Sequence, residues 1–187
     1  MTDLRRVVVL LLLLTTAGCN VTSHETTDRG ADVLAHPIVL DLSTGLTRAQ
    51  FGMGPDDIDA ALQRHDHSTF PVTVRLRDGR TIEADADTLM AISAGAGKPV
   101  TRVEISMRHL SRSAWETALS SAIDDLGVDP DVVAAYEAGV ARGGFSADEI
   151  RSFDTDVKKP DRVQVESIVT ALEGRRSVSY SITRGQG

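Results

Sequence analysis

Metal-ligating side chains gather in the segment His65-Asp66-His67, where the two imidazoles have the H-x-H spacing seen among zinc ligands. A usual zinc site needs three or four ligands, supported by hydrogen-bond partners. The remaining histidines are distant in the sequence: His24, His36 and His109. Because the sequence does not bring these histidines together, we interpret residues 65–67 as a solvated loop.

Three carboxylates, Glu83, Asp85 and Asp87, alternate along the chain. A strand would place all three on one face, where they could gather a calcium ion. An EF-hand loop needs glycine at its sixth position, and Thr88 stands there. We therefore interpret the three carboxylates as a solvated strand face, whose crowded negative charge discourages pairing with another strand.

The glycine-rich segment 94–99, AGAGKP, contains a Gly-Lys pair that could suggest a phosphate-binding loop. The P-loop needs glycine five places before that pair and serine or threonine after it, but Ile92 and Pro99 hold those places. No Gly-x-Ser-x-Gly motif occurs, and we interpret Trp115 and Tyr136 as core aromatics. The sequence thus predicts no catalytic residue, no cofactor and no metal site.

The chain begins with a pattern that is typical of export. Arg5 and Arg6 precede eight apolar residues, Val7 to Leu14, and small or polar residues follow as far as Cys19, the only cysteine. A charged start, a short apolar run and small residues at its exit are typical of a secretory signal peptide. The run is too short to cross a bilayer, which takes about 20 residues.

The segment Thr16-Ala17-Gly18-Cys19 resembles the lipobox of bacterial lipoproteins. The resemblance implies that a diacylglyceryl group is attached to the sulfur of Cys19 and that the chain is cut before it. Ala17 and Gly18 match the pattern, whereas Thr16 stands where an aliphatic residue is usual. Two acyl chains suffice for stable anchoring, so we expect a protein held at the extracytoplasmic face of the cell membrane. The alternative is a plain signal peptide or an uncleaved anchor with a chance cysteine.

This interpretation divides the chain into a signal peptide (residues 1–18), a flexible tether (19–33) and a single domain (34–187). The net charge is −7, and cleavage removes Asp3, Arg5 and Arg6, which leaves −8. Such an acidic surface argues against nucleic-acid binding. With no cysteine besides Cys19, the domain cannot form an internal disulfide. Arginine far outnumbers lysine, which suggests a GC-rich, actinobacterial genome.

Hydrophobic periodicity predicts an α+β domain with an antiparallel sheet and helices packed on one of its faces. Alternation predicts three strand regions: 36–42, a hairpin over 72–87 with a type I′ turn at Asp78-Gly79, and 100–107. Helical spacing predicts five helices: 55–64, 88–94, 113–126 with a capping box at Ser113–Glu116, 130–140 and 146–153. At the C-terminus we prefer a hairpin of residues 162–171 and 176–184 to a helix over 165–172.

Residues 45–62, GLTRAQFGMGPDDIDAAL, resemble small envelope lipoproteins related to the outer-membrane assembly lipoprotein and to β-lactamase-inhibitor-like domains. The likeness lies in the order of elements rather than in a motif, and it implies a turn, a short helix and then strands. Arg64-His65-Asp66 departs from the glycine and proline that often close that helix.

As a function we expect a non-enzymatic envelope lipoprotein that binds a protein or small ligand at the membrane surface, and we expect a monomer. Two alternatives stay open. A hydrolase with residues scattered in sequence would bring a histidine and a carboxylate together in a cleft. A carrier of an apolar ligand would enclose a cavity lined by aliphatic side chains.

Overall fold

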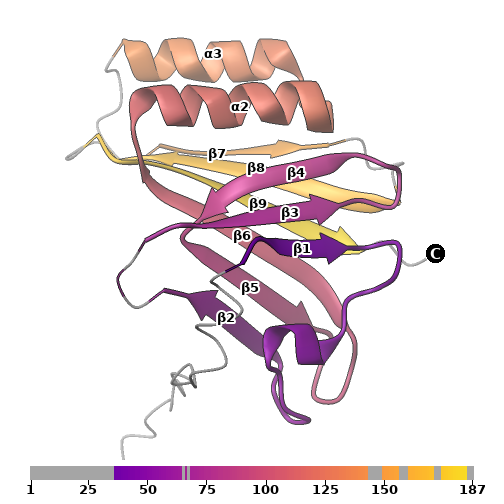
Figure 1. Cartoon of the computed structure of the whole chain (residues 1–187). Coiled ribbons are helices and arrows are strands. Elements are labelled where there is room, and N and C mark those ends of the chain that lie inside the picture. Colours follow the sequence, from indigo (N-terminus) through magenta and orange to yellow (C-terminus); the bar gives the residue numbers. More distant parts are fainter. Residues whose placement is uncertain are drawn as a thin grey trace, which may run out of the picture.

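The computed structural model describes residues 36–64, 66, 68–142, 149–155, 160–170 and 174–184. Cys19, the predicted tether, His65 and His67 lie outside the described residues. The described part contains nine strands in two sheets and two α-helices. It confirms the expected α+β class with helices on an antiparallel sheet, and it adds a second, smaller sheet (Figure 1).

The smaller sheet has three strands in the order β1-β3-β4: β1 (Ile38–Asp41), β3 (Phe70–Arg75) and β4 (Thr81–Ala86). The larger sheet has six strands in the order β2-β5-β6-β9-β8-β7: β2 (Asp59–Gln63), β5 (Thr88–Ser93), β6 (Val100–Leu110), β9 (Arg176–Arg184), β8 (Asp161–Val169) and β7 (Glu149–Asp154). The pairing of β1 with β3 is parallel, and the others are antiparallel.

The two sheets are joined where β4 runs almost directly into β5. Only Asp87 separates these strands, and its backbone N–H donates to the carbonyl of Ser106 on β6 at 2.9 Å. The chain therefore leaves the small sheet and enters the large one without a loop.

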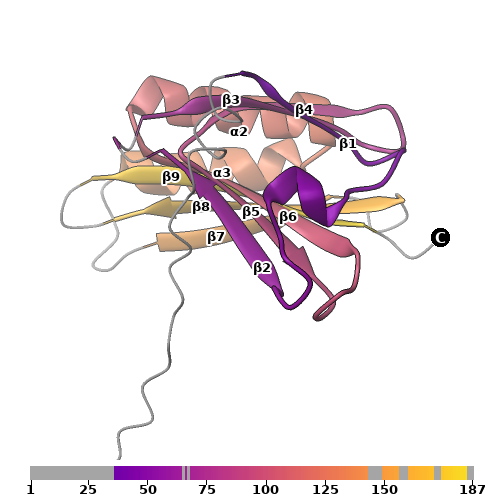
Figure 2. The same ribbon diagram turned by 60° about the horizontal axis from the view of Figure 1, so that its bottom comes forward.

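One face of the large sheet is covered by a second layer, formed by both helices and the small sheet (Figures 1 and 2). The helices are α2 (Arg112–Leu126) and α3 (Pro130–Ala141). Across this layer the order is α3, α2, β4, β3, β1, and α2 contacts β4, β6 and β9. Alternate residues of β5, β6, β8 and β9 are buried, as expected for a sheet with one covered face.

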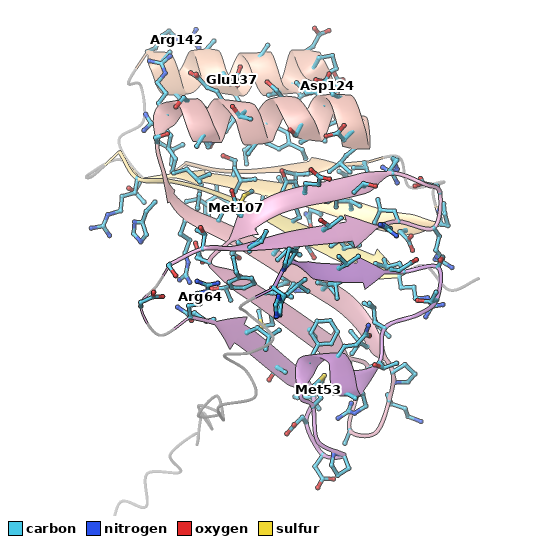
Figure 3. The ribbon with its side chains drawn as sticks, in the orientation of Figure 1. Met53, Arg64, Met107, Asp124, Glu137 and Arg142 are labelled. Carbon is cyan, nitrogen blue, oxygen red and sulfur yellow. The ribbon has the colours of Figure 1, made fainter. Side chains whose placement is uncertain are left out.

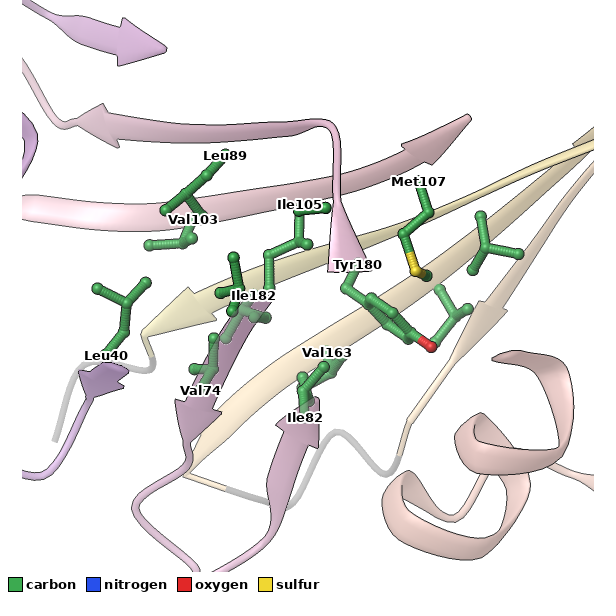
Figure 4. Packing of buried hydrophobic residues seen from close by; sticks show 14 of the residues in the cluster. Leu40, Val74, Ile82, Leu89, Val103, Ile105, Met107, Val163, Tyr180 and Ile182 are labelled. Atoms are coloured by element: carbon green, nitrogen blue, oxygen red, sulfur yellow. The ribbon is translucent and has the colours of Figure 1, made fainter. Parts of the chain in front are cut away.

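The core lies between these layers and forms one cluster of buried hydrophobic side chains. Figure 4 shows how residues of the large sheet, such as Ile105 and Ile182, face residues of the small sheet, such as Val74 and Ile82. Burial of this apolar surface is the main stabilising contribution, because the described residues contain no cysteine that could form a disulfide.

Helix α2 confirms the expected apolar face, since its buried residues are Trp115, Leu119, Ala122 and Leu126, and Gly127 ends it with φ +76°. The expected capping box at Ser113–Glu116 is wrong, because the helix begins earlier in the chain. The N-cap is Ser111, whose Oγ accepts from the N–H of Ala114 at 3.2 Å. Helix α3 begins at Pro130, as expected.

Three of the expected helices are strands. Residues 55–64 contain β2, residues 88–94 contain β5, and residues 146–153 overlap β7. In the first segment the helical spacing rests on Ile58, which is 58% exposed and contributes little burial. In each case a neighbouring strand supplies the backbone hydrogen bonds. This tertiary pairing overrides a short and ambiguous apolar pattern.

The hairpin of β3 and β4 is confirmed, but its turn is not of type I′. That turn needs positive φ at both central residues, and in this hairpin only Gly79 has it, at +88°. The N–H of Leu76 donates to the carbonyl of Arg80 at 2.9 Å, which closes a three-residue loop. The preferred C-terminal hairpin is also confirmed, as β8 and β9.

Candidate functional site

The glycine-rich segment 94–99 is a turn between β5 and β6. The N–H of Lys98 donates to the carbonyl of Gly95 at 3.0 Å, and the carbonyl of Lys98 accepts from the guanidinium of Arg48 at 2.9 Å. The same guanidinium binds the carbonyl of Asp57 at 2.7 Å. The segment is therefore a structural loop that is tied to the loop before β2.

The acidic candidates separate in the fold. Glu83 and Asp85 are exposed on β4, but Asp87 lies beyond the strand and is 7% exposed, so the prediction of one shared face is wrong. Asp87 accepts from the Nε of Arg108 at 2.8 Å and from the hydroxyl of Thr88 at 3.1 Å. Its role is to hold the junction between the sheets, because a buried carboxylate needs such partners.

Asp66 is the described member of the histidine segment. Its carboxylate accepts from the backbone N–H and the hydroxyl of Ser68, at 3.0 Å and 2.7 Å, and these hydrogen bonds hold its pKa below the usual value. This geometry is that of a local turn, in which the aspartate is engaged by its own loop.

A hollow of about 440 Å³ lies where the helix pair meets the beginning of β9. It is lined by the start of α2, five residues of α3 and one residue of β9: Arg112, Trp115, Glu116, Ala134, Glu137, Ala138, Val140, Ala141 and Arg176. Its volume falls in the range of small-molecule sites, about 300–1,000 Å³. The sequence candidates contribute only Trp115 to this site.

The floor of the hollow is anchored in the core by hydrogen bonds to Ser167 on β8. The indole Nε1 of Trp115 donates to the Oγ of Ser167 at 2.8 Å, and the hydroxyl of Tyr136 lies 3.3 Å from the same atom. The rings of Trp115 and Tyr136 meet edge to face at 5.9 Å, and Tyr136 meets Phe153 likewise at 5.8 Å. These contacts confirm both aromatics as core residues and fix the indole beneath the hollow.

Arg176 covers the Trp115 ring with its guanidinium carbon 5.8 Å from the ring centroid, a cation–π geometry. One of its Nη atoms donates to the carbonyl of Gly174 at 2.9 Å. The Nε is buried and has no hydrogen-bond partner among the described residues. The guanidinium therefore keeps hydrogen-bonding capacity that the described fold does not use.

Glu137 stands on α3 at the end of the helix pair where α2 begins, and Asp124 lies toward the opposite end (Figure 3). Partial burial and the nearby carboxylate of Glu116 raise the pKa of Glu137, against a weaker opposing effect of Arg112. Glu116 is itself paired with Arg112, whose Nε lies 2.7 Å from its Oε1. Glu137 forms no hydrogen bond or ion pair with another described residue.

A β-bulge precedes the hollow. The register of β6 against β9 shifts between Met107 and Leu110, and His109 has φ +56°. Among the described residues it is the only non-glycine residue with positive φ. Such backbone strain costs on the order of 1 kcal/mol and is enriched at functional sites. The bulge turns the chain from the sheet into α2, which places Arg112 and Glu116 at the hollow.

No motif or spacing in the sequence indicates a functional role for Glu137 or Arg176. The i, i+4 pair of Arg112 and Glu116 is visible in the sequence. However, the approach of β9 to α2 and α3 depends on the register of β6 with β9, which pairs Leu110 with Arg176. That register is a long-range property, so local periodicity could not have located the site.

The chain matches no protein-family model, no curated protein and no solved structure. In the described ranges no helix has the length and apolar character needed to span a membrane. The same residues contain no group of three or more histidine, cysteine or acidic side chains placed to hold a metal ion.

Proposed function

We propose that the protein is a lipid-anchored envelope protein that binds a small ligand in the hollow between α2, α3 and the start of β9. The lipobox-like segment ending at Cys19 supports the anchor, and the geometry of the hollow supports binding. The ligand site lies in the layer that the helices form over β7, β8 and β9 (Figure 1).

The observation that carries the binding proposal is a contrast between charged groups. Buried carboxylates elsewhere are engaged by the fold: Asp161 is paired with Arg77 and Asp87 with Arg108, each at 2.8 Å. In the hollow, Glu137 and Arg176 are half-buried, and neither forms an ion pair with a described residue, although Arg112 is near enough to Glu137 to oppose the rise of its pKa. Groups that are desolvated without a structural partner are typical of binding sites.

The rigidity of the floor also supports binding rather than catalysis. The indole of Trp115 is held by Ser167 and by the ring of Tyr136, so the surface beneath a ligand is preorganised. A preorganised aromatic floor with a few charged groups at its rim orients a ligand without requiring a nucleophile.

The test fills the hollow and asks whether a bound molecule is lost. Ala138 and Ala135 are both exposed on α3, but only Ala138 lines the hollow. The full chain is extracted from its native envelope in detergent, and small molecules that remain bound are detected by native mass spectrometry. We expect a bound mass in the wild type and in Ala135→Trp that is absent from Ala138→Trp.

Equal occupancy in the two tryptophan variants would contradict a site in the hollow. The same conclusion would follow if the wild-type protein carried no bound molecule. Thermal unfolding of both variants shows whether the substitutions have similar effects on the fold, as expected for exposed helix positions.

A further inference from the structure

Two of the four charged residues that line the hollow form no ion pair with a described residue. Arg112 and Glu116 form an i, i+4 ion pair at 2.7 Å and neutralise each other. The two charges that remain are one carboxylate, Glu137 on α3, and one guanidinium, Arg176 on β9. These two side chains line the same hollow but do not form an ion pair with each other. Glu137 and Arg176 therefore suit one positive and one negative group of a ligand.

The rest of the lining is small and apolar. Four aliphatic residues of α3 form one wall: Ala134, Ala138, Val140 and Ala141. Methyl groups make the wall shallow and leave room for an apolar body between the charged groups. Trp115 provides an aromatic surface beneath it. The indole is only 2% exposed and lies under Arg176, so the apolar surface that a ligand would cover is the α3 wall. A ligand that carries only charge would leave this wall in water, so the lining favours a molecule with an aliphatic side chain.

We propose that the ligand is a small zwitterion with an apolar side chain, such as an α-amino acid or a short peptide, and this rests on the proposed function. The ammonium group binds the carboxylate of Glu137. The carboxylate of the ligand binds the guanidinium of Arg176, whose planar donors suit a bidentate contact.

The proposed contacts would offset the unfavourable environment of the ionised Glu137 side chain. The ionised form of Glu137 is disfavoured by partial burial and by Glu116, and an ammonium group would offset both effects. Arg176 would gain a carboxylate partner at the terminal nitrogens of its guanidinium, which forms no ion pair with a described residue. Neither contact disturbs the cation–π arrangement over Trp115, which keeps the guanidinium in place.

The test measures the affinity of the full lipidated chain in detergent for L-leucine by isothermal titration calorimetry. Two analogues each remove one charge: N-acetyl-L-leucine lacks the ammonium group, and L-leucinamide lacks the carboxylate. We expect both analogues to bind about tenfold or more weakly than L-leucine. Leucyl-leucine, which separates the two charges further, distinguishes a free amino acid from a peptide as the natural source of this chemistry.

Variants assign each charge to its residue. Glu137→Gln should weaken L-leucine about tenfold or more but leave the affinity for N-acetyl-L-leucine unchanged. Arg176→Gln should weaken L-leucine similarly and leave L-leucinamide unchanged. Asp124→Asn, at the other end of α2, is the matched charge control and should alter none of these affinities. If Arg176→Gln fails to unfold cooperatively, the Glu137 arm decides the proposal by itself.

The zwitterion proposal is overturned if neither L-leucine nor leucyl-leucine binds. It is also overturned if Glu137→Gln leaves the affinity for L-leucine unchanged. A native bound molecule that is lost in Ala138→Trp would still support the hollow as the binding site. Failure of the zwitterion proposal can therefore be distinguished from failure of the proposed function.

Discussion

Ser167 is the residue on which the aromatic floor of the hollow depends. It lies on the inward face of β8 and is fully buried, and its Oγ accepts from the indole of Trp115 at 2.8 Å. The hydroxyl of Tyr136 lies within hydrogen-bond distance of both its Oγ and its carbonyl. This small polar side chain fits an apolar interface because it forms hydrogen bonds with the indole N–H of Trp115 and the hydroxyl of Tyr136.

Replacing Ser167 by alanine should lower the free energy of unfolding by about 1–3 kcal/mol, since the buried indole N–H is left without an acceptor. Ser181, on the solvent-facing side of β9, provides the control, and Ser181→Ala should change stability by less than about 0.5 kcal/mol. Urea denaturation of both variants measures the difference. Equal effects would show that the indole hydrogen bond contributes nothing to stability.

Tyr180 provides a test of burial through its pH dependence. Burial, and to a smaller degree Asp125, raises the pKa of Tyr180 to about 12 from 10.0, and its hydroxyl donates to the carbonyl of Ala118 at 3.3 Å. Because the folded pKa is above the unfolded one, this group favours folding fully below pH 10. The contribution is lost as the pH rises from about 10 to about 12.

Between pH 10 and 12 the wild type should therefore lose stability faster than Tyr180→Phe, by about 1.4 kcal/mol per pH unit. Other titrating groups are common to both proteins and cancel in the comparison. Urea midpoints at pH 9 and pH 11 measure the effect. Parallel losses in the two proteins would mean that the phenol ionises equally well in the folded state.

At the scale of elements, the tip of the β3–β4 hairpin is tied to the start of β8. Asp161 is fully buried and accepts from the backbone N–H of Arg77 at 2.7 Å and from its Nε at 2.8 Å. This contact links the small sheet to the large one at the opposite side from the Asp87 junction. Arg162 and Asp154 form another arginine–aspartate pair, between neighbouring strands. That pair is exposed, whereas Asp161 is buried.

Burial decides what each pair contributes. Arg77→Ala should lower stability by about 3 kcal/mol, because it leaves a buried carboxylate without its counter-charge. Arg162→Ala breaks a pair whose side chains are 55% and 48% exposed, and should cost less than about 1 kcal/mol. Thermal unfolding of the two variants compares them directly, and similar losses would contradict a structural role for Asp161.

Long and strongly periodic segments could be predicted from the sequence, whereas short ones could not. Helix α2 has four buried residues at helical spacing, and β6 has a long alternation, so one period fits each of them clearly. The short strands β2, β5 and β7 fit both periods, and their state is decided by pairing with distant strands. The candidate site depends on such pairing. Among the residues that line it, only Trp115 was considered as a candidate from the sequence.

At the scale of the whole molecule, a proposed membrane anchor is joined to a proposed ligand-binding domain. The described fold begins at residue 36, and β1 starts at Ile38, so the segment from Cys19 to residue 37 connects the proposed anchor to the first strand. An anchor of two acyl chains would hold the domain at the membrane surface, where the hollow could meet ligands outside the cytoplasm.

Mass spectrometry of the N-terminal peptide, from protein purified out of its native membrane, tests the anchor most directly. The account predicts a chain that begins at Cys19 and carries a diacylglyceryl group on the sulfur, with residues 1–18 removed. An intact leader, or an unmodified thiol at Cys19, would contradict it.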